Sequence, residues 1–294
     1  MNDWQPYVDD LLKRQTPCGG FSGQPGGRHR PDAAAWAVLA LRAMRAHAEP
    51  GPILDRLAQG QLRDGRVPID PDYPQAFWPT SEAILAWNGS AAHSTNQARA
   101  VDFLLRTSGV HYRLDKDAVV EHDTTIRGWP WIEKTHSWVE PTAMALLALE
   151  CASQAGHARA EEARRMLLNR QLESGGWNYG NTKVYCVELR PSMESTGLAL
   201  HALAGHVSAK DVQKSLGYLQ AEVSGTRGPL WLGWSILALS AWGRRPAGVS
   251  DWIVESLERQ SVYGSYDTAW ISALLLAARC ENGLDLSHKS SKHG

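Results

Sequence analysis

QLESGGWNYG, at residues 171–180, places a glutamine, a glycine four residues later and a tryptophan two residues after that within one turn-rich decapeptide. The same spacing occurs in QTPCGGF (15–21) and QSVYGSY (260–266), and a weaker copy is QLRDGRV (61–67). A turn that recurs along a chain marks a structural unit, so internal repeats are the first property to test.

A second recurring piece follows each of these turns. It consists of segments that are rich in Ala and Leu and nearly free of charge, which predicts helices that are apolar most of the way round and therefore buried. These segments are DAAAWAVLALRA (32–43), TSEAILAW (80–87), EPTAMALLAL (140–149), ESTGLALHAL (194–203), LGWSILALSAW (232–242) and DTAWISALLLAA (267–278).

The segments between them are amphipathic. AEEARRMLLNRQL (160–172) and VSDWIVESLERQ (249–260) each carry one charged face, which is typical of an outer helix. The repeating unit is therefore an outer helix, a Gly/aromatic turn and an inner helix. Asp123 takes the glutamine position in the third copy, Gln220 takes it in a degenerate fifth copy, and one insertion spans 107–125.

Six such units fill the chain, and one hairpin cannot bury its inner helix alone, so the units must stack. The last inner segment, WISALLLAA, is as apolar as the others, whereas an open solenoid would end in a polar cap. The sequence predicts an all-α fold: a single (α/α)6 toroid, or barrel, of six helical-hairpin repeats. We expect one domain over 1–285 and a polar, disordered tail over 286–294.

Composition narrows the classes of function. The chain has 294 residues, of which 43% are hydrophobic and 21% charged, and its net charge of −1 offers no excess of basic charge for nucleic acid. No segment has the length of a transmembrane helix, and the N-terminus does not resemble a signal peptide, although peripheral contact with a membrane stays open. Four isolated cysteines, Cys18, Cys151, Cys186 and Cys280, favour a reducing compartment and a cytoplasmic location.

The turns resemble the QW motif, QxxxGxW/F, of squalene–hopene and oxidosqualene cyclases. The inner segments are similar to the prenyltransferase/squalene-oxidase repeat of the terpenoid cyclase and protein prenyltransferase superfamily, and the likeness runs from Gln15 to Ala278. In that family the glutamine binds a neighbouring helix end and the aromatic residue stacks on its turn, so the resemblance implies a structural role for QLESGGWNYG. It also implies a stand-alone toroid that acts on an isoprenoid or another apolar chain.

Acidic residues recur where inner helices begin. The catalytic candidates are Asp267, Glu140 and Glu194, and Asp32 has the same placement. Each is either an N-cap that satisfies free backbone N–H groups or a cavity acid whose pKa burial raises, which would let it donate a proton.

The resemblance bears on Asp267 alone. In class II terpene cyclases the proton donor is the middle Asp of a DxDD motif, and this chain has no such motif. Only the final Asp has a counterpart, in GSYDTA (264–269), where Tyr266 takes the donor position and Asp267 follows it.

Tryptophan is unusually frequent, with 13 Trp against 3 Phe. Aromatic faces stabilise a cation by ~2 kcal/mol each when desolvated, and they also grip a polyisoprene chain or a sugar, although packing between repeats is the competing explanation. The densest piece is GWPWIEKTHSWVEP (128–141), which we expect to form the main site. The substrate-binding candidates are Trp129, Trp131, His136, Trp138, Trp36, Trp78, Trp177, Tyr185, Trp234 and Trp270.

We expect no metal and no cofactor. The Asp, Cys and His zinc ligands of the protein prenyltransferases have no counterpart, and Cys186 and His201 are interpreted as packing residues. Three functions remain, in order of preference: acid-initiated cyclisation or isomerisation of an isoprenoid, a non-catalytic module for a lipid or protein partner, and a carbohydrate-active (α/α)6 enzyme, which needs two carboxyls across a wet cleft.

Overall fold

The structure is a computed structural model that describes residues 3–46, 50–115, 118–284 and 286. Apart from Leu286, the predicted tail lies outside the described residues, as does the predicted boundary at residue 285.

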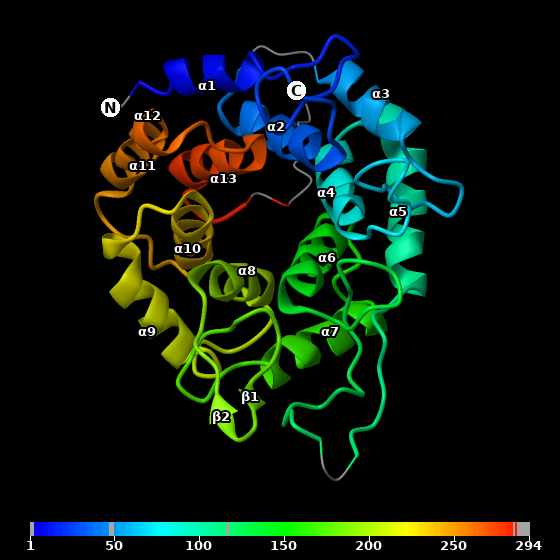
Figure 1. The fold of residues 1–294 in the computed structure, drawn as a ribbon, viewed down its shortest axis with the longest axis vertical. Helices are drawn as coiled ribbons and strands as arrows, with labels where there is room; N and C mark the ends of the chain where they lie inside the picture. The colour runs from blue at the N-terminus through cyan, green and yellow to red at the C-terminus, as the bar shows by residue number, and fades with distance from the viewer. Residues whose placement is uncertain (1–2, 47–49, 116–117, 285, 287–294) are drawn as a thin grey trace, which may run out of the picture.

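Two concentric rings of helices make up the described part of the chain (Figure 1). The inner ring contains α2 (Pro31–Ala43), α4 (Trp78–Trp87), α6 (Val139–Cys151), α8 (Met193–Leu203), α10 (Pro229–Ala241) and α13 (Thr268–Arg279). The outer ring contains α1 (Gln5–Leu12), α3 (Gly51–Gln59), α5 (Ser94–Arg106), α7 (Ala158–Asn169), α9 (Gln213–Glu222) and α11 (Val249–Glu258).

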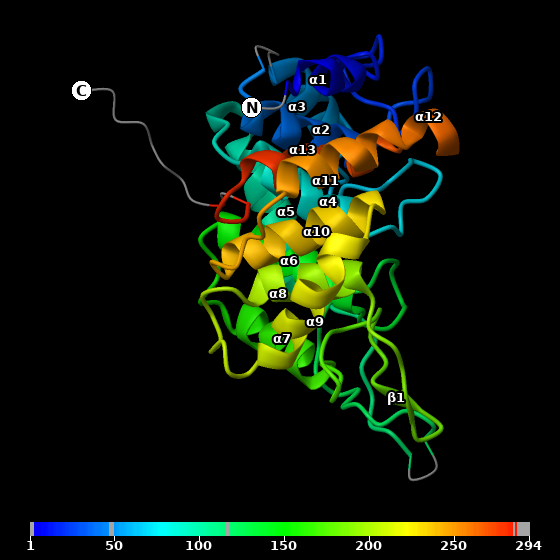
Figure 2. The same ribbon diagram turned by 90° about the vertical axis from the view of Figure 1, so that its left-hand side faces the viewer.

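Short elements complete the chain. They are the 3-10 turns η1 (Ala91–His93) and η2 (Val223–Gly225), the single turn α12 (Gln260–Tyr263) and an antiparallel hairpin of β1 (Lys183–Val184) and β2 (Val187–Glu188). Figure 2 shows this hairpin projecting from the toroid beyond α7 and α9.

Each inner helix packs on the next one along the chain, and α13 packs on α2, which closes the ring. The sequence explains the two layers. α10 is buried without interruption from Leu232 to Ser240, whereas α7 buries only the face that carries Ala160, Ala163, Met166 and Leu167. The predicted all-α (α/α)6 toroid is thereby confirmed.

The turn at Gln171 joins neighbouring outer helices. The Gln171 side-chain amide donates to Ser215 Oγ at 2.7 Å, at the beginning of α9, and Trp177 Nε1 donates to the Leu167 carbonyl at 2.7 Å. A Cβ at Gly175, where φ is +102°, would lie 2.8 Å from the backbone of Lys214. The glycine therefore allows the next outer helix to approach the turn.

Arg14 connects the first repeat to the last. Its Nη1 donates to the carbonyls of Tyr266 (2.6 Å) and Gly23 (3.2 Å), and its Nη2 donates to Ser265 Oγ (2.8 Å). The Thr268 N–H donates to the Gly23 carbonyl at 2.8 Å. Residues about 250 positions apart in sequence thus share one buried cation.

Candidate active site at the mouth of the toroid

A pocket of ≈ 380 Å³ opens at the N-terminal ends of the inner helices. Each inner helix contributes two lining residues four positions apart, which is about one helical turn, so the lining forms a rim layer and a deep layer. The rim layer contains Asp32, Trp78, Glu140, Glu194, Leu230 and Ala269, and the deep layer contains Trp36, Glu82, Met144, Leu198, Trp234 and Ala273. Arg30, Trp131, Asp267 and Trp270 complete the lining.

Glu82 is the acid of the deep layer. It is 8% exposed, its Oε1 accepts from Trp36 Nε1 at 2.8 Å, and its buried Oε2 has no partner among the described residues. Burial, and secondarily the negative charge of Asp32, raise the pKa of Glu82 well above its usual range. Both effects favour the protonated carboxylic acid, and the unpartnered Oε2 is the oxygen free to carry its proton.

Two half-buried rim acids, Glu140 and Glu194, begin neighbouring helices. Glu140 Oε1 accepts from Ser195 Oγ at 2.9 Å, and burial raises the pKa of Glu140 despite this bond. Burial, together with the charge of Glu140, raises the pKa of Glu194 to about 7. Glu194 thus exchanges a proton near neutral pH, and the pair can act as acid or base.

The remaining two acids of the pocket, Asp32 and Asp267, form ion pairs with Arg30. Arg30 Nη1 donates to Asp267 Oδ2 at 2.8 Å, and the rest of the Arg30 guanidinium holds the carboxylate of Asp32. Asp267 is also the N-cap of α13, because its Oδ1 accepts from the Ala269 N–H at 3.0 Å. With both oxygens engaged, Asp267 is placed as a cap and counter-ion, not as a free proton donor.

Five tryptophans line the pocket. Trp36 and Trp234 lie edge to face with ring centroids 5.6 Å apart, and Trp78 and Trp131 do so at 5.7 Å. Trp270 adds a half-exposed ring at the rim. All five, together with Glu140, Glu194 and Asp267, are among the residues that the sequence nominated, and the pocket brings them together.

Trp129 and Trp177 do not line the pocket, and the expectation that they do needs correction. They are 1% and 0% exposed, and each donates its Nε1 to the last turns of an outer helix, to Leu104 and Leu167 respectively. Arg159 lies over the Trp129 ring at 4.4 Å. These rings point outward because they are the aromatic positions of the turn, which fills the space between the two helical layers.

Trp138, His136 and Tyr185 also lie outside this pocket. Trp138 and His136 line a separate cavity beside the insertion. Tyr185 is 75% exposed at the turn of the β1–β2 hairpin, with φ at +51°. The dense segment at 128–141 therefore serves two cavities instead of one, and Trp131 and Glu140 are its contribution to the pocket.

Sequence reasoning missed Glu82 because the inner segment was taken to begin at Thr80. The helix begins at Trp78, with Pro79 in its first turn, so Glu82 lies one turn inside the helix. Two signals could have revealed it: Glu82 is the single charge in an otherwise uncharged segment, and it is four residues after Trp78.

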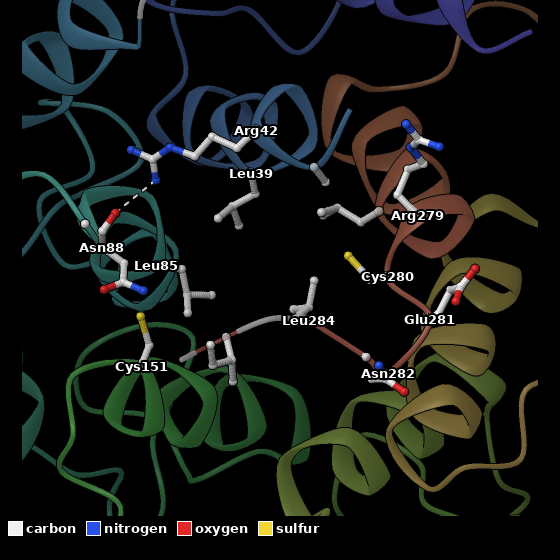
Figure 3. A pocket seen from close by; sticks show the side chains of 15 residues that line it. Leu39, Arg42, Leu85, Asn88, Cys151, Arg279, Cys280, Glu281, Asn282 and Leu284 are labelled. Carbon is white, nitrogen blue, oxygen red and sulfur yellow. Dashed lines mark hydrogen bonds between the residues drawn. The ribbon is translucent and has the colours of Figure 1, made fainter. Parts of the chain in front are cut away.

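A larger cavity of ≈ 920 Å³ lies at the opposite end of the inner ring (Figure 3). Residues at the carboxyl ends of α2, α4, α6 and α13 line it together with residues 280–284 and Leu286, and the Leu284 N–H donates to His201 Nε2 at 2.9 Å. Of its described lining residues only Glu281 is acidic, and Glu281 is exposed. Buried acids instead lie in the smaller pocket, where proton transfer has its candidate groups.

Within the described ranges, no group of three or more His, Cys, Asp and Glu residues is placed to hold a metal ion. Nor does any helix of that part of the chain have the length and apolar character needed to cross a membrane.

Comparison with known proteins places the fold but not the family. No family model matches the chain, and no curated protein sequence does. The α-1,6-mannanase GH76A of Salegentibacter sp. HEL1_6 superposes with a TM-score of 0.62 at 11% identity, over 95% of this chain and 99% of the mannanase.

Two terpene cyclases are also similar in structure. ent-Copalyl diphosphate synthase from Streptomyces platensis gives a TM-score of 0.54 at 19% identity, over 86% of this chain and 50% of the synthase. The type II terpene cyclase MstE from Scytonema, solved as a variant with its product merosterolic acid A, gives 0.50 at 15% identity, over 95% of this chain and 79% of the cyclase. At such identities the likeness shows a shared toroid fold alone.

Proposed function

We propose that the chain acts on an isoprenoid or a similar unsaturated apolar chain in the Trp-lined pocket, and that Glu82 starts the reaction by protonating a carbon–carbon double bond. The product would be a cyclised or isomerised chain. The observation that carries this proposal is the placement of Glu82, a buried acid that Trp36 binds through one oxygen while the other has no partner among the described residues.

The deep layer supports the chemistry. Protonation of an alkene needs an acid that is neutral when the substrate arrives, and burial of Glu82 favours its neutral form. The carbocation formed by proton transfer from Glu82 would lie in the deep layer beside Trp36 and Trp234, and the ring quadrupole of a tryptophan face stabilises a desolvated cation.

The rim layer contains a group that can accept the proton lost from the carbocation. Loss of a proton from a carbon next to the cation would form the new double bond, and Glu194, half ionised near neutral pH, is placed to accept that proton. The substrate gains one proton from Glu82 and returns one to Glu194. The cycle closes when Glu194 releases its proton to water and Glu82 takes one up from water before the next turnover. Asp32 and Asp267 are two carboxylates paired with the single positive charge of Arg30, so this cluster carries a net negative charge. That charge would further stabilise the carbocation.

Glycoside hydrolysis is the second candidate, supported by one observation. Glu140 and Glu194 are two half-exposed carboxyls on neighbouring helices whose pKa values are both raised, and a glycosidase uses such a pair to protonate a glycosidic oxygen and to assist its departure. The apolar deep layer counts against a sugar, because a sugar needs several hydrogen-bonding partners along its hydroxyl groups. A non-catalytic module that binds a lipid or protein partner is the third reading.

The test compares the protein with its Glu82→Gln variant. Each is incubated with linear isoprenoids (farnesol, geranylgeraniol and squalene), with their diphosphates and with α-1,6-linked mannose oligosaccharides, and products are identified by mass spectrometry. We expect a cyclised or isomerised isoprenoid from the unmodified protein and a loss of about 10³-fold or more in the variant, because removal of a general acid costs on the order of 10²–10⁴ in rate.

Glu222→Gln, on an exposed face of α9, is the matched control and should leave turnover unchanged. Release of mannose with no isoprenoid product would move the assignment to glycoside hydrolysis. Unchanged isoprenoid turnover in Glu82→Gln would exclude Glu82 as the donor.

A further inference from the structure

We propose that the chain holds a small oxyanion of the phosphate class in the cavity beside the insertion, with Arg170, His122 and His136 as its donors. This site lies apart from the central pocket and does not depend on the reaction proposed there. Either a free phosphate or the anionic head of a larger ligand would satisfy it.

The cavity has a volume of ≈ 200 Å³ and lies between the insertion, the turn after α7 and the segment before α6. Its polar lining consists of Tyr112, His122, Thr124, His136, Arg170 and Asn181, together with Ser137. None of the described lining residues carries a carboxylate, so the cavity presents hydrogen-bond donors and the Arg170 cation.

Arg170 is a buried cation with an incomplete set of partners. It is 6% exposed, its Nη1 donates to the Gly180 carbonyl at 2.7 Å, and its buried Nε has no partner among the described residues. None of the ion pairs among the described residues includes Arg170. Burial lowers the pKa of Arg170 to about 10, with Asp123 opposing the shift only in part, and a cation in that state gains from an anionic ligand.

The two histidines face the same space. His122 is 6% exposed and its Nδ1 has no partner among the described residues. Burial, with the charge of Arg170 next, lowers the pKa of His122 to about 4. His136 lies against Tyr112 with ring centroids 5.6 Å apart. An anion between these groups would offset the charge of Arg170, which disfavours a second positive charge on His122, and would give each ring an acceptor.

The first repeat contains a similar buried arginine, Arg14, which has a larger set of protein partners. Arg14 precedes Gln15 as Arg170 precedes Gln171. Arg14 binds the Gly23 carbonyl, and Arg170 binds the Gly180 carbonyl, which lies one residue further along its turn. Arg14 has in addition the Tyr266 carbonyl, Ser265 Oγ and, at 3.2 Å, Asp10 Oδ2.

The backbone register shows what replaces those partners in the fourth repeat. The Thr268 N–H donates to the Gly23 carbonyl, and the Val139 N–H donates to the Tyr179 carbonyl in the same manner. Val139 therefore corresponds to Thr268, and His136 corresponds to Ser265. Ser265 binds Arg14 directly, whereas its counterpart His136 lines a cavity that it shares with Arg170. In the proposed site a ligand oxygen in this cavity takes the place of the protein acceptors that Arg14 has and Arg170 lacks.

The experiment is a calorimetric titration of the whole chain with sodium phosphate at low chloride concentration. Arg170→Met should weaken phosphate binding at least tenfold, equal to about 1.4 kcal/mol. Arg113→Met removes the same charge from an exposed position of the insertion and should change the affinity less than twofold. No phosphate binding by the unmodified protein, or an equal loss in Arg113→Met, would overturn the proposal.

A second variant and a second readout cover the role of Arg170 in folding. His136→Ala removes an exposed ring, so it should weaken phosphate binding several-fold with an unchanged melting temperature. In NMR spectra the pKa of His122 should rise from about 4 on phosphate binding, because the anion offsets the charge of Arg170. The other charged or titratable groups around these two residues are Asp123, His136 and Tyr112. If the pKa of His122 measured by NMR does not change when phosphate is added, the proposed site is contradicted.

Geranyl phosphate separates the two sources of the anion. Binding much tighter than that of inorganic phosphate, and lost in Arg170→Met, would identify the head of a larger ligand. Equal affinities would identify a free anion, and both results support the site.

Discussion

The acids of the central pocket differ because they lie at different depths. Asp32, Glu140 and Glu194 are in the first turn of their helices, where free N–H groups and the helix dipole favour a carboxylate. Glu82 lies one turn deeper, where the backbone N–H groups are already bonded within the helix. In the deep layer the neutral form of a carboxyl group is therefore favoured, whereas the carboxyl groups of the rim layer titrate or form ion pairs.

Glu194 gives a prediction about pH. Burial raises the pKa of Glu194 in the folded protein to about 7, above the ordinary value of 4.5, so folding favours the protonated form. The stability that Glu194 contributes is complete below about pH 4.5 and is lost as pH rises through 7, because the unfolded chain then binds fewer protons. Glu194→Gln should melt at a more constant temperature between pH 5 and pH 8 than the unmodified protein.

Calorimetry at several pH values measures this difference, and Glu222→Gln should reproduce the unmodified curve. If Glu194→Gln and the unmodified protein lose stability in parallel over that range, the pKa of Glu194 is not raised.

At the scale of the element, the recurring turn sets the spacing of the outer helices. Gly65 and Gly175 occupy the same position in two repeats, both with positive φ, and a Cβ at either would meet the backbone of the following outer helix, at Arg99 or Lys214. The glutamines of these turns donate to Asn96 and Ser215, at the beginning of the same outer helices.

Gly175→Ala should therefore destabilise the protein by about 2 kcal/mol or more, since it adds backbone strain to a steric conflict that flexible side chains cannot relieve. Gly217→Ala is the matched control, because Gly217 lies exposed within α9 and its Cβ would meet nothing within 4 Å. That change should stabilise the chain by ~0.5–1 kcal/mol. Urea unfolding monitored by circular dichroism measures both, and equal effects of one sign would contradict this account of the turn.

At the scale of the whole molecule, closure of the ring joins the ends of the described chain. α13 packs on α2, and Arg14 places one buried guanidinium between Tyr266, Gly23 and Ser265. Closure leaves no inner helix exposed at an end, which is why the last repeat needs no polar cap.

Arg14→Met should lower the free energy of unfolding by about 3 kcal/mol, because the carbonyls of Tyr266 and Gly23 lose a buried charged donor. Lys13→Met removes the same charge from the neighbouring exposed position and should change stability by less than ~0.5 kcal/mol. Hydrogen exchange of the α13 amides in Arg14→Met should accelerate more than that of α6 amides, and uniform acceleration would deny Arg14 a special part in closure.

The sequence by itself determined the toroid. Uncharged segments such as LGWSILALSAW are buried in any packing, their spacing requires a second layer, and an equally apolar last segment requires a closed ring. The sequence also identified most residues at the mouth of the pocket. The inner helices all begin at the same end of the barrel, so acids and tryptophans at their beginnings lie near one another. Asp267, Glu140 and Glu194 were located in this way.

Only the tertiary structure decided which side chains face the pocket. Trp129 and Trp36 were both nominated as pocket residues, yet only Trp36 lines the pocket. Trp129 lies in the turn before α6 and packs outward under Arg159, whereas Trp36 lies within α2 and donates to Glu82. The depth of Glu82 depended on where α4 begins, two residues before the predicted start. The cavity of Arg170, His122 and His136 follows from contacts between the insertion and a distant turn, and no periodic pattern encodes contacts of that kind.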